Sequence, residues 1–214
     1  GAEPVRTSVV PDTAGSQPMV IPLWSGEMPH TITGQRRPEE QYVNDVPRHL
    51  VIMGAAGSGK TTVSTTLSEH LGWIAAEADE FHPPASIASM TAGIPLTDED
   101  RWPWLESIRE WMSAQARNGR STVIACSALK RSYRDVLSRA EGRVQFVHLD
   151  GAPEVLTDRM VTRRGHWMPV SLLPSQLAAL EPLDEEEDGL TVDFLSTPAN
   201  ISAQILEGLL LADS

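Results

Sequence analysis

The most constraining feature of the sequence is the stretch from Leu50 to Thr62, which reads Leu-Val-Ile-Met-Gly-Ala-Ala-Gly-Ser-Gly-Lys-Thr-Thr. Its four apolar residues predict a buried strand, and the glycines that follow predict a tight turn that opens a helix near Lys60. The spacing G-x-x-x-x-G-K-T is that of a P-loop. An ordinary strand-turn-helix connection with a solvated lysine is the alternative interpretation.

Each residue type of this turn has a physical reason to bind a nucleotide phosphate. Glycines lack a Cβ, so their N–H groups can approach a phosphate, and the first turn of the helix adds unpaired donors. Lys60 supplies a positive charge for the β- and γ-phosphates, and the Thr61 hydroxyl is a candidate Mg²⁺ ligand. The predicted nucleotide-binding residues of the loop are Gly54, Ala55, Ala56, Gly57, Ser58, Gly59, Lys60, Thr61 and Thr62.

Length, charge and cysteine content narrow the class of protein. The chain has 214 residues, which suits one α/β domain with some residues left over. Its formal net charge of -12 argues against nucleic acid as the main partner, because binding a phosphate backbone requires a basic face. No apolar run reaches membrane-spanning length, so we expect no membrane partner. The single cysteine, Cys126, excludes an internal disulfide and fits a reducing cytoplasm.

The composition changes along the chain. Residues 1–47 hold seven of the 16 prolines and show no sustained hydrophobic period, so we predict a poorly structured leader there and one P-loop domain over 48–214. The apolar cluster from Val20 to Trp24 could dock on the domain or on a neighbouring subunit.

Seven acidic residues and no basic residue lie between Glu181 and Asp193. This run predicts a solvated loop, with a docking site for a partner as the alternative.

Strand patterns alternate with helix patterns over the rest of the chain. Strands are expected over 50–53, 73–78, 121–126, 144–150 and 190–194. Helices are expected from the P-loop to Gly72, through Met90, over 98–118, around Tyr133 to Ala140, over 153–164, over 174–180 and from Pro198 onward. This alternation predicts an α/β fold with a parallel sheet and right-handed crossovers.

Two carboxylates fall at the end of the second expected strand. Ligands of open α/β sheets lie at the carboxyl edge of the strands, so we expect Glu77 and Asp79 to face the P-loop. Asp79 can accept a proton or a hydrogen bond from a substrate hydroxyl. Glu77 could hold Mg²⁺ through water. Two solvated acids at an exposed strand end are the alternative interpretation.

Several cations follow strand ends or helix ends. Arg159 and Arg163 lie one helical turn apart, which suits a lid that closes over ATP phosphates, although a basic surface patch is the alternative. Arg101 stands near the start of a helix, where the dipole disfavours a cation, and this placement favours binding of a carboxylate. Lys130 and Arg134 lie four residues apart and could converge on an anionic substrate.

Together, these motifs resemble the gluconokinase family of P-loop sugar-acid kinases. The resemblance spans residues 49–211 and keeps the order of the family. The matching stretches are 51–62, Asp79–Pro83, Met90–Leu105, Cys126–Asp135, Arg163–Trp167 and Ser175–Pro182. The P-loop alone indicates only a nucleotide site, whereas the runs G-x-P-L-x-D-x-D-R-x-P-W-L and C-S-A-L-K-x-x-Y-R-D are far more specific.

The resemblance implies transfer of the ATP γ-phosphoryl group to the 6-hydroxyl of D-gluconate, with Mg²⁺. It also implies a three-layer, nucleoside-monophosphate-kinase-like fold with a five-stranded parallel sheet and a helical lid, commonly as a homodimer. The implied catalytic residues are Lys60, Asp79 and Arg163, with Arg159 as a further nucleotide ligand. The candidate metal ligands are Thr61 and, through water, Glu77. The implied substrate-binding residues are Asp79, His82, Arg101, Lys130, Arg134 and His166.

The chain departs from the family at three positions. Glu77 stands where aspartate is usual, which keeps the charge but moves it outward by one methylene, and Ser86 and Ser89 replace a common asparagine and lysine. His82 has a packing role as an alternative to substrate binding. The alternative functions are a kinase for another small acid, such as shikimate or a different sugar acid, and an ATP-binding regulatory protein without turnover.

Overall fold

The computed structural model describes residues 46–162 and 168–211. All of the described residues belong to one compact unit, Asn44–Ser214. The predicted leader therefore lies almost wholly outside the described residues and stays a prediction. Within the described ranges, no helix is both long enough and apolar enough to cross a membrane.

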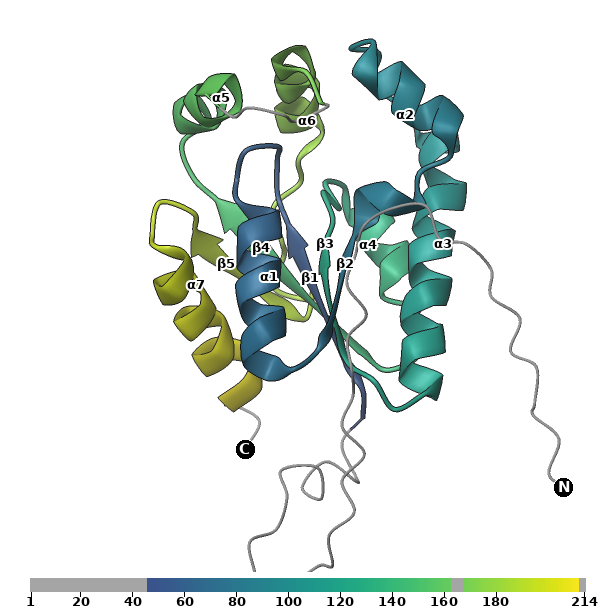
Figure 1. The fold of residues 1–214 in the computed structure, drawn as a ribbon, viewed down its shortest axis with the longest axis vertical. Helices are drawn as coiled ribbons and strands as arrows, with labels where there is room; N and C mark the ends of the chain where they lie inside the picture. The colour runs from purple at the N-terminus through teal and green to yellow at the C-terminus, as the bar shows by residue number, and fades with distance from the viewer. Residues whose placement is uncertain (1–45, 163–167, 212–214) are drawn as a thin grey trace, which may run out of the picture. The chain divides into compact units, whose positions relative to one another are not determined.

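Within the described residues, five strands form one parallel sheet, as the sequence predicts (Figure 1). They are β1 (Arg48–Met53), β2 (Ile74–Glu77), β3 (Thr122–Ala125), β4 (Arg143–Asp150) and β5 (Gly189–Asp193). Their order is β2-β3-β1-β4-β5, so β3 lies between β1, which leads into the P-loop, and β2, which leads to Asp79. The P-loop and Asp79 therefore flank the carboxyl end of β3.

Helices cover both faces of the sheet and make three layers (Figure 1). The helices of one face are α1 (Lys60–Leu71) and α7 (Pro198–Ile205), and those of the other are α3 (Asp98–Arg117) and α4 (Arg131–Leu137). Successive residues of β1 point to opposite faces, and its central residues are fully buried because both faces are covered. Leu50 and Ile52 pack with α1 and α7, whereas Val51 and Met53 pack with α3 and α4.

Shorter elements lie beyond the carboxyl edge of the sheet (Figure 1). They are the 3-10 turns η2 (Ala78–Phe81) and η3 (Val170–Leu172) and the helices α2 (Pro84–Thr91), α5 (Pro153–Thr162) and α6 (Leu173–Ala179). A separate apolar cluster of Met90, Leu96 and Leu172, with Met168 packed against it, joins the α2 region to η3. A π-helical turn, Leu206–Leu211, follows α7.

Local capping signals account for several helix ends. Gly59 has a φ of 98° and Gly72 a φ of 68°, so these residues bound α1 in the left-handed conformation that glycine adopts easily. Thr97 and Asp100 form a reciprocal capping box that starts α3. The predicted end of the 153–164 helix falls at the edge of the described residues, where α5 is described to Thr162.

The acidic segment before β5 differs from the expected solvated loop. Glu187 has a side chain only 5% exposed and is paired with Arg134, so that prediction is wrong for this residue. Asp188 pairs with Arg143 at 2.7 Å. The carboxylates bind arginines from other parts of the chain, a pairing that local charge pattern does not reveal.

Candidate active site

The P-loop is tightly packed against neighbouring backbone. Gly54 and Gly57 have φ values of 139° and 85°, which L-residues with a Cβ rarely adopt. A Cβ at Gly54 would lie 2.8 Å from the carbonyl oxygen of Leu149, and one at Gly57 would lie 3.1 Å from that of Leu156. Glycine is therefore required at both positions by conformation and by space.

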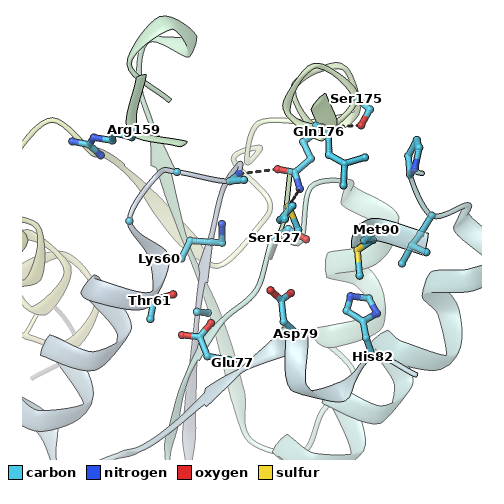
Figure 2. A pocket seen from close by; sticks show the side chains of 18 of the residues that line it. Lys60, Thr61, Glu77, Asp79, His82, Met90, Ser127, Arg159, Ser175 and Gln176 are labelled. Carbon is cyan, nitrogen blue, oxygen red and sulfur yellow. Dashed lines mark hydrogen bonds between the residues drawn. The ribbon is translucent and has the colours of Figure 1, made fainter. Parts of the chain in front are cut away.

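A cavity of about 390 Å³ opens in front of this loop (Figure 2). It lies at the carboxyl edge of the sheet, where ligands of α/β folds bind. The predicted site residues that line it are Ala56, Gly57, Gly59, Lys60, Thr61, Thr62, Glu77, Asp79, His82, Arg101 and Arg159. Gly54, Ala55 and Ser58 belong to the same loop but do not line the cavity. The predicted residues Arg163 and His166 lie outside the described residues.

Charged groups of both signs meet inside this cavity. The Lys60 Nζ donates a hydrogen bond to the Ala55 carbonyl oxygen at 3.0 Å, and this bond holds the ammonium group against the loop. Figure 2 shows the Lys60 side chain and the Asp79 carboxylate directed into the cavity from different walls. The fold therefore brings the phosphate-binding lysine and the candidate acceptor-orienting aspartate to one space.

Thr61 and Glu77 form the candidate metal site. Burial raises the pKa of Glu77, the neighbouring Thr61 hydroxyl opposes that rise, and the nearby Asp79 charge adds to it. Oxygen donors of this kind suit Mg²⁺. Among residues 46–162 and 168–211, no group of three histidine, cysteine or acidic residues is placed to hold a metal alone. The donor set fits an ion that takes its other ligands from phosphate and water.

His82 is held flat against Trp104 at the other end of the cavity. The two rings stack with centroids 4.2 Å apart and an interplanar angle of 10°. Burial, together with the charge of Arg101, lowers the pKa of His82 to about 4, so the imidazole is neutral near pH 7. The Trp104 Nε1 donates to the Ala78 carbonyl oxygen at 2.7 Å, which fixes the turn that carries Asp79.

Two arginines of the cavity lining lie against aromatic rings. The Arg101 guanidinium lies 5.6 Å from the centre of the Tyr133 ring and makes long hydrogen bonds of 3.4 and 3.5 Å to the Leu96 carbonyl oxygen. Arg159 lies over the Phe194 ring at 4.9 Å and donates to the Phe194 carbonyl oxygen at 3.3 Å. Both line the cavity, and their ligand-binding roles stay predictions.

Two predicted substrate residues do not enter the cavity. Arg134 is 1% exposed, its Nε lies 2.5 Å from the Glu187 Oε1, and its NH1 donates to the Ala128 and Leu129 carbonyl oxygens. The prediction that Arg134 binds an anionic substrate is wrong, because all of these donors are used inside the fold. Lys130 also lies outside the cavity lining, and its Nζ is 2.8 Å from both Asp98 oxygens.

The structure adds Gln176 and Ser127, which sequence reasoning missed. Gln176 of α6 lines the cavity, and its Oε1 accepts a hydrogen bond from the Ala56 N–H at 2.7 Å (Figure 2). Ser127, which follows β3, also lines the cavity, and its carbonyl oxygen accepts from the Gly54 N–H at 3.3 Å. Both residues lie within stretches that resemble the family, but no local pattern indicates that they reach the P-loop.

Comparisons with known proteins identify the family. The chain is 52% identical over 160 residues to the gluconokinase of Gluconobacter oxydans, an alignment that covers 75% of this chain and 90% of the relative. It is 39% identical over 162 residues to the thermosensitive gluconokinase of Escherichia coli, with 75% and 87% covered. The chain belongs to the gluconokinase family. No protein-family model matches the chain.

Solved structures extend this likeness from sequence to fold. An unliganded sugar kinase from Janibacter superposes with a TM-score of 0.74 at 52% identity, covering 78% of this chain and 97% of that one. A gluconokinase from Sinorhizobium meliloti superposes with a TM-score of 0.70 at 44% identity, covering 79% and 95%. The predicted P-loop, nucleoside-monophosphate-kinase-like fold of the gluconokinase family is confirmed, and the chain is a kinase.

Proposed function

We propose that this gluconokinase-family protein transfers the γ-phosphoryl group of ATP to the 6-hydroxyl of D-gluconate. The observation that carries the proposal is that Lys60, Asp79 and Arg101 line one cavity. These side chains supply charge for the moving phosphoryl group, a carboxylate for the attacking hydroxyl and a cation for the acid group of the acceptor. The 52% identity to a gluconokinase supports the choice of acceptor.

The P-loop half of the cavity binds the nucleotide. The loop N–H groups and the amino end of α1 bind the phosphates, with Lys60 and Arg159 as the mobile cations. Thr61 and Glu77 would hold Mg²⁺, and this ion would neutralise charge on the nucleotide phosphates when it is bound. Lys60 exchanges its hydrogen bond with the Ala55 carbonyl oxygen for one with a phosphate oxygen.

The other half of the cavity binds the acceptor. The 6-hydroxyl oxygen attacks the γ-phosphorus, the bond from that phosphorus to the β–γ bridging oxygen breaks, and the hydroxyl proton passes to Asp79. Neutral His82 hydrogen-bonds a hydroxyl of the sugar acid without repelling Arg101. Arg101 then pairs with the gluconate carboxylate. The proposed products are 6-phosphogluconate and ADP.

A coupled assay of ADP release tests this function. The purified protein is given ATP and, in turn, gluconate, shikimate and other sugar acids, each with and without Mg²⁺. We expect ADP formation that requires both gluconate and Mg²⁺. Higher kcat/KM with a different acid would replace the proposed acceptor, and ATP binding without ADP formation on any acid would favour a regulatory protein.

The buried, single Cys126 supports the proposed cytoplasmic location.

A further inference from the structure

Helix α6 reaches across the cavity and contacts the P-loop through one side chain. The Gln176 Oε1 lies 2.7 Å from the Ala56 nitrogen, and its Nε2 lies 3.3 Å from the Met168 Sδ. Only the amide oxygen can accept from a backbone N–H, so this contact fixes the orientation of the amide. The two residues are 120 positions apart in the chain, and the contact ties two separate elements together.

The segment that leads into α6 is also held at the acceptor side of the cavity. Leu172 of η3 is 4% exposed and packs with Met90 and Leu96, which come from α2 and from the turn that follows it. The Gly93 backbone also lies close to the Ser171 side chain, since a Cβ at Gly93 would lie 3.2 Å from the Ser171 Oγ. Residues 168–176 therefore cover the cavity with an apolar contact on the acceptor side and a polar contact on the nucleotide side.

The polar contact lies beside the groups that react. Ala56, Gln176, Lys60 and Asp79 all line the same cavity, and Figure 2 shows the Gln176 amide directed into the space that Lys60 and Asp79 face. Without Gln176, the Ala56 N–H would need a water molecule as its partner. A water held there would lie in the cavity from which a phosphoryl-transfer enzyme must exclude water.

We propose that Gln176 is a positioning residue that couples the cover formed by residues 168–176 to the P-loop and so favours transfer to the acceptor over transfer to water. The inference rests on the proposed function. In the competing reaction, a water oxygen bonds to the γ-phosphorus, the bond to the β–γ bridging oxygen breaks, and ADP and phosphate are released. When the amide contact is lost, the cover closes less often, the acceptor dissociates sooner and water reaches the γ-phosphoryl group.

The main test replaces Gln176 with methionine, which keeps length and volume but removes the acceptor oxygen. ADP and 6-phosphogluconate are measured in the same reaction, with and without gluconate, and nucleotide binding is measured by calorimetry with ADP. We expect the KM for gluconate to rise about tenfold, equivalent to about 1.4 kcal/mol, and the ratio of ADP to 6-phosphogluconate to rise above that of the wild type. The Kd for ADP should stay within about twofold.

Two further variants make the outcome decisive. Gln204→Met, at an exposed position on α7, should behave as the wild type, and Gln176→Ala should change both quantities in the same direction as Gln176→Met. Unchanged KM and product ratio in both Gln176 variants would overturn the inference. Tighter ADP binding would also overturn it, because the amide would then compete with phosphate for the Ala56 N–H. A wild-type protein without gluconate turnover would instead contradict the proposed function.

Discussion

Arg134 and Glu187 form an ion pair inside the fold, with side chains that are 1% and 5% exposed. Their second contact, from the Arg134 NH2 to the Glu187 Oε2, measures 2.8 Å. The remaining guanidinium donors reach the carbonyl oxygens of Ala128, Leu129, Glu181 and Pro182. The pair therefore fixes the turn after β3 against the segment before β5, and it contributes to stability instead of substrate binding.

Replacing Arg134 with methionine should destabilise the protein by about 3–5 kcal/mol, because Glu187 would be left as a buried charge without its partner. The free energy of unfolding, measured in urea, checks this value. Arg139→Met is the matched control: the Arg139 side chain is 62% exposed, and its loss should change the unfolding free energy by less than about 1 kcal/mol. Unchanged stability with a raised KM for gluconate would restore the substrate role of Arg134.

Replacing Lys60 with alanine should lower kcat/KM for ATP by at least about a hundredfold, because the transition state loses a charge worth several kcal/mol. Steady-state ADP release with saturating gluconate measures the effect. Arg120→Ala removes an exposed positive charge that does not line the cavity and should leave the rate within about twofold. Turnover of the Lys60 variant at the wild-type rate would reject the P-loop assignment.

Replacing Asp79 with asparagine should leave ATP binding largely intact and reduce gluconate turnover by about a hundredfold or more, because the amide cannot take the hydroxyl proton. Calorimetry separates binding from turnover in this variant. Glu80→Gln offers a control on the same 3-10 turn, since Glu80 is exposed and does not line the cavity. Gluconate turnover by the Asp79→Asn variant at the wild-type rate would reject Asp79 as the base that takes the hydroxyl proton.

The pKa of His82, about 4 in the folded protein and 6.5 when unperturbed, makes stability depend on pH. The unfolded chain binds this proton first as the pH falls, so the stability of the fold decreases below pH 6.5. At about 1.4 kcal/mol for each pKa unit, His82 should remove about 3 kcal/mol of unfolding free energy between pH 7 and pH 4. Urea unfolding across this range measures the slope.

His82→Gln should flatten that pH dependence, whereas His70→Gln, at an exposed position on α1, should not. Part of the slope should remain in the His82 variant, because burial also lowers the pKa values of His49 and His148. An unchanged slope in His82→Gln would mean that His82 does not titrate below its ordinary range.

Local sequence patterns predicted the order of strands and helices, the phosphate-binding turn and the two carboxylates that face it. The period of apolar residues indicated the strands and helices, and the glycine spacing from Gly54 to Gly59 indicated the phosphate-binding turn. Parallel strands present their carboxyl ends at one edge, so the position of Glu77 and Asp79 after a strand was enough to predict that they face the P-loop. These features depend on residues that are close together in the chain.

Only the tertiary structure distinguished Arg134 from Arg101. Both are arginines close to the expected acceptor end, yet Arg134 is buried by a partner 53 positions away, whereas Arg101 lines the cavity. The contact between Gln176 and Ala56 spans 120 positions and had no local signal. Local residue patterns therefore predict which elements form and where the phosphate-binding turn lies. Which charges are buried and which face the cavity depended on how distant segments pack, because the burial of a side chain is a property of its neighbours in space.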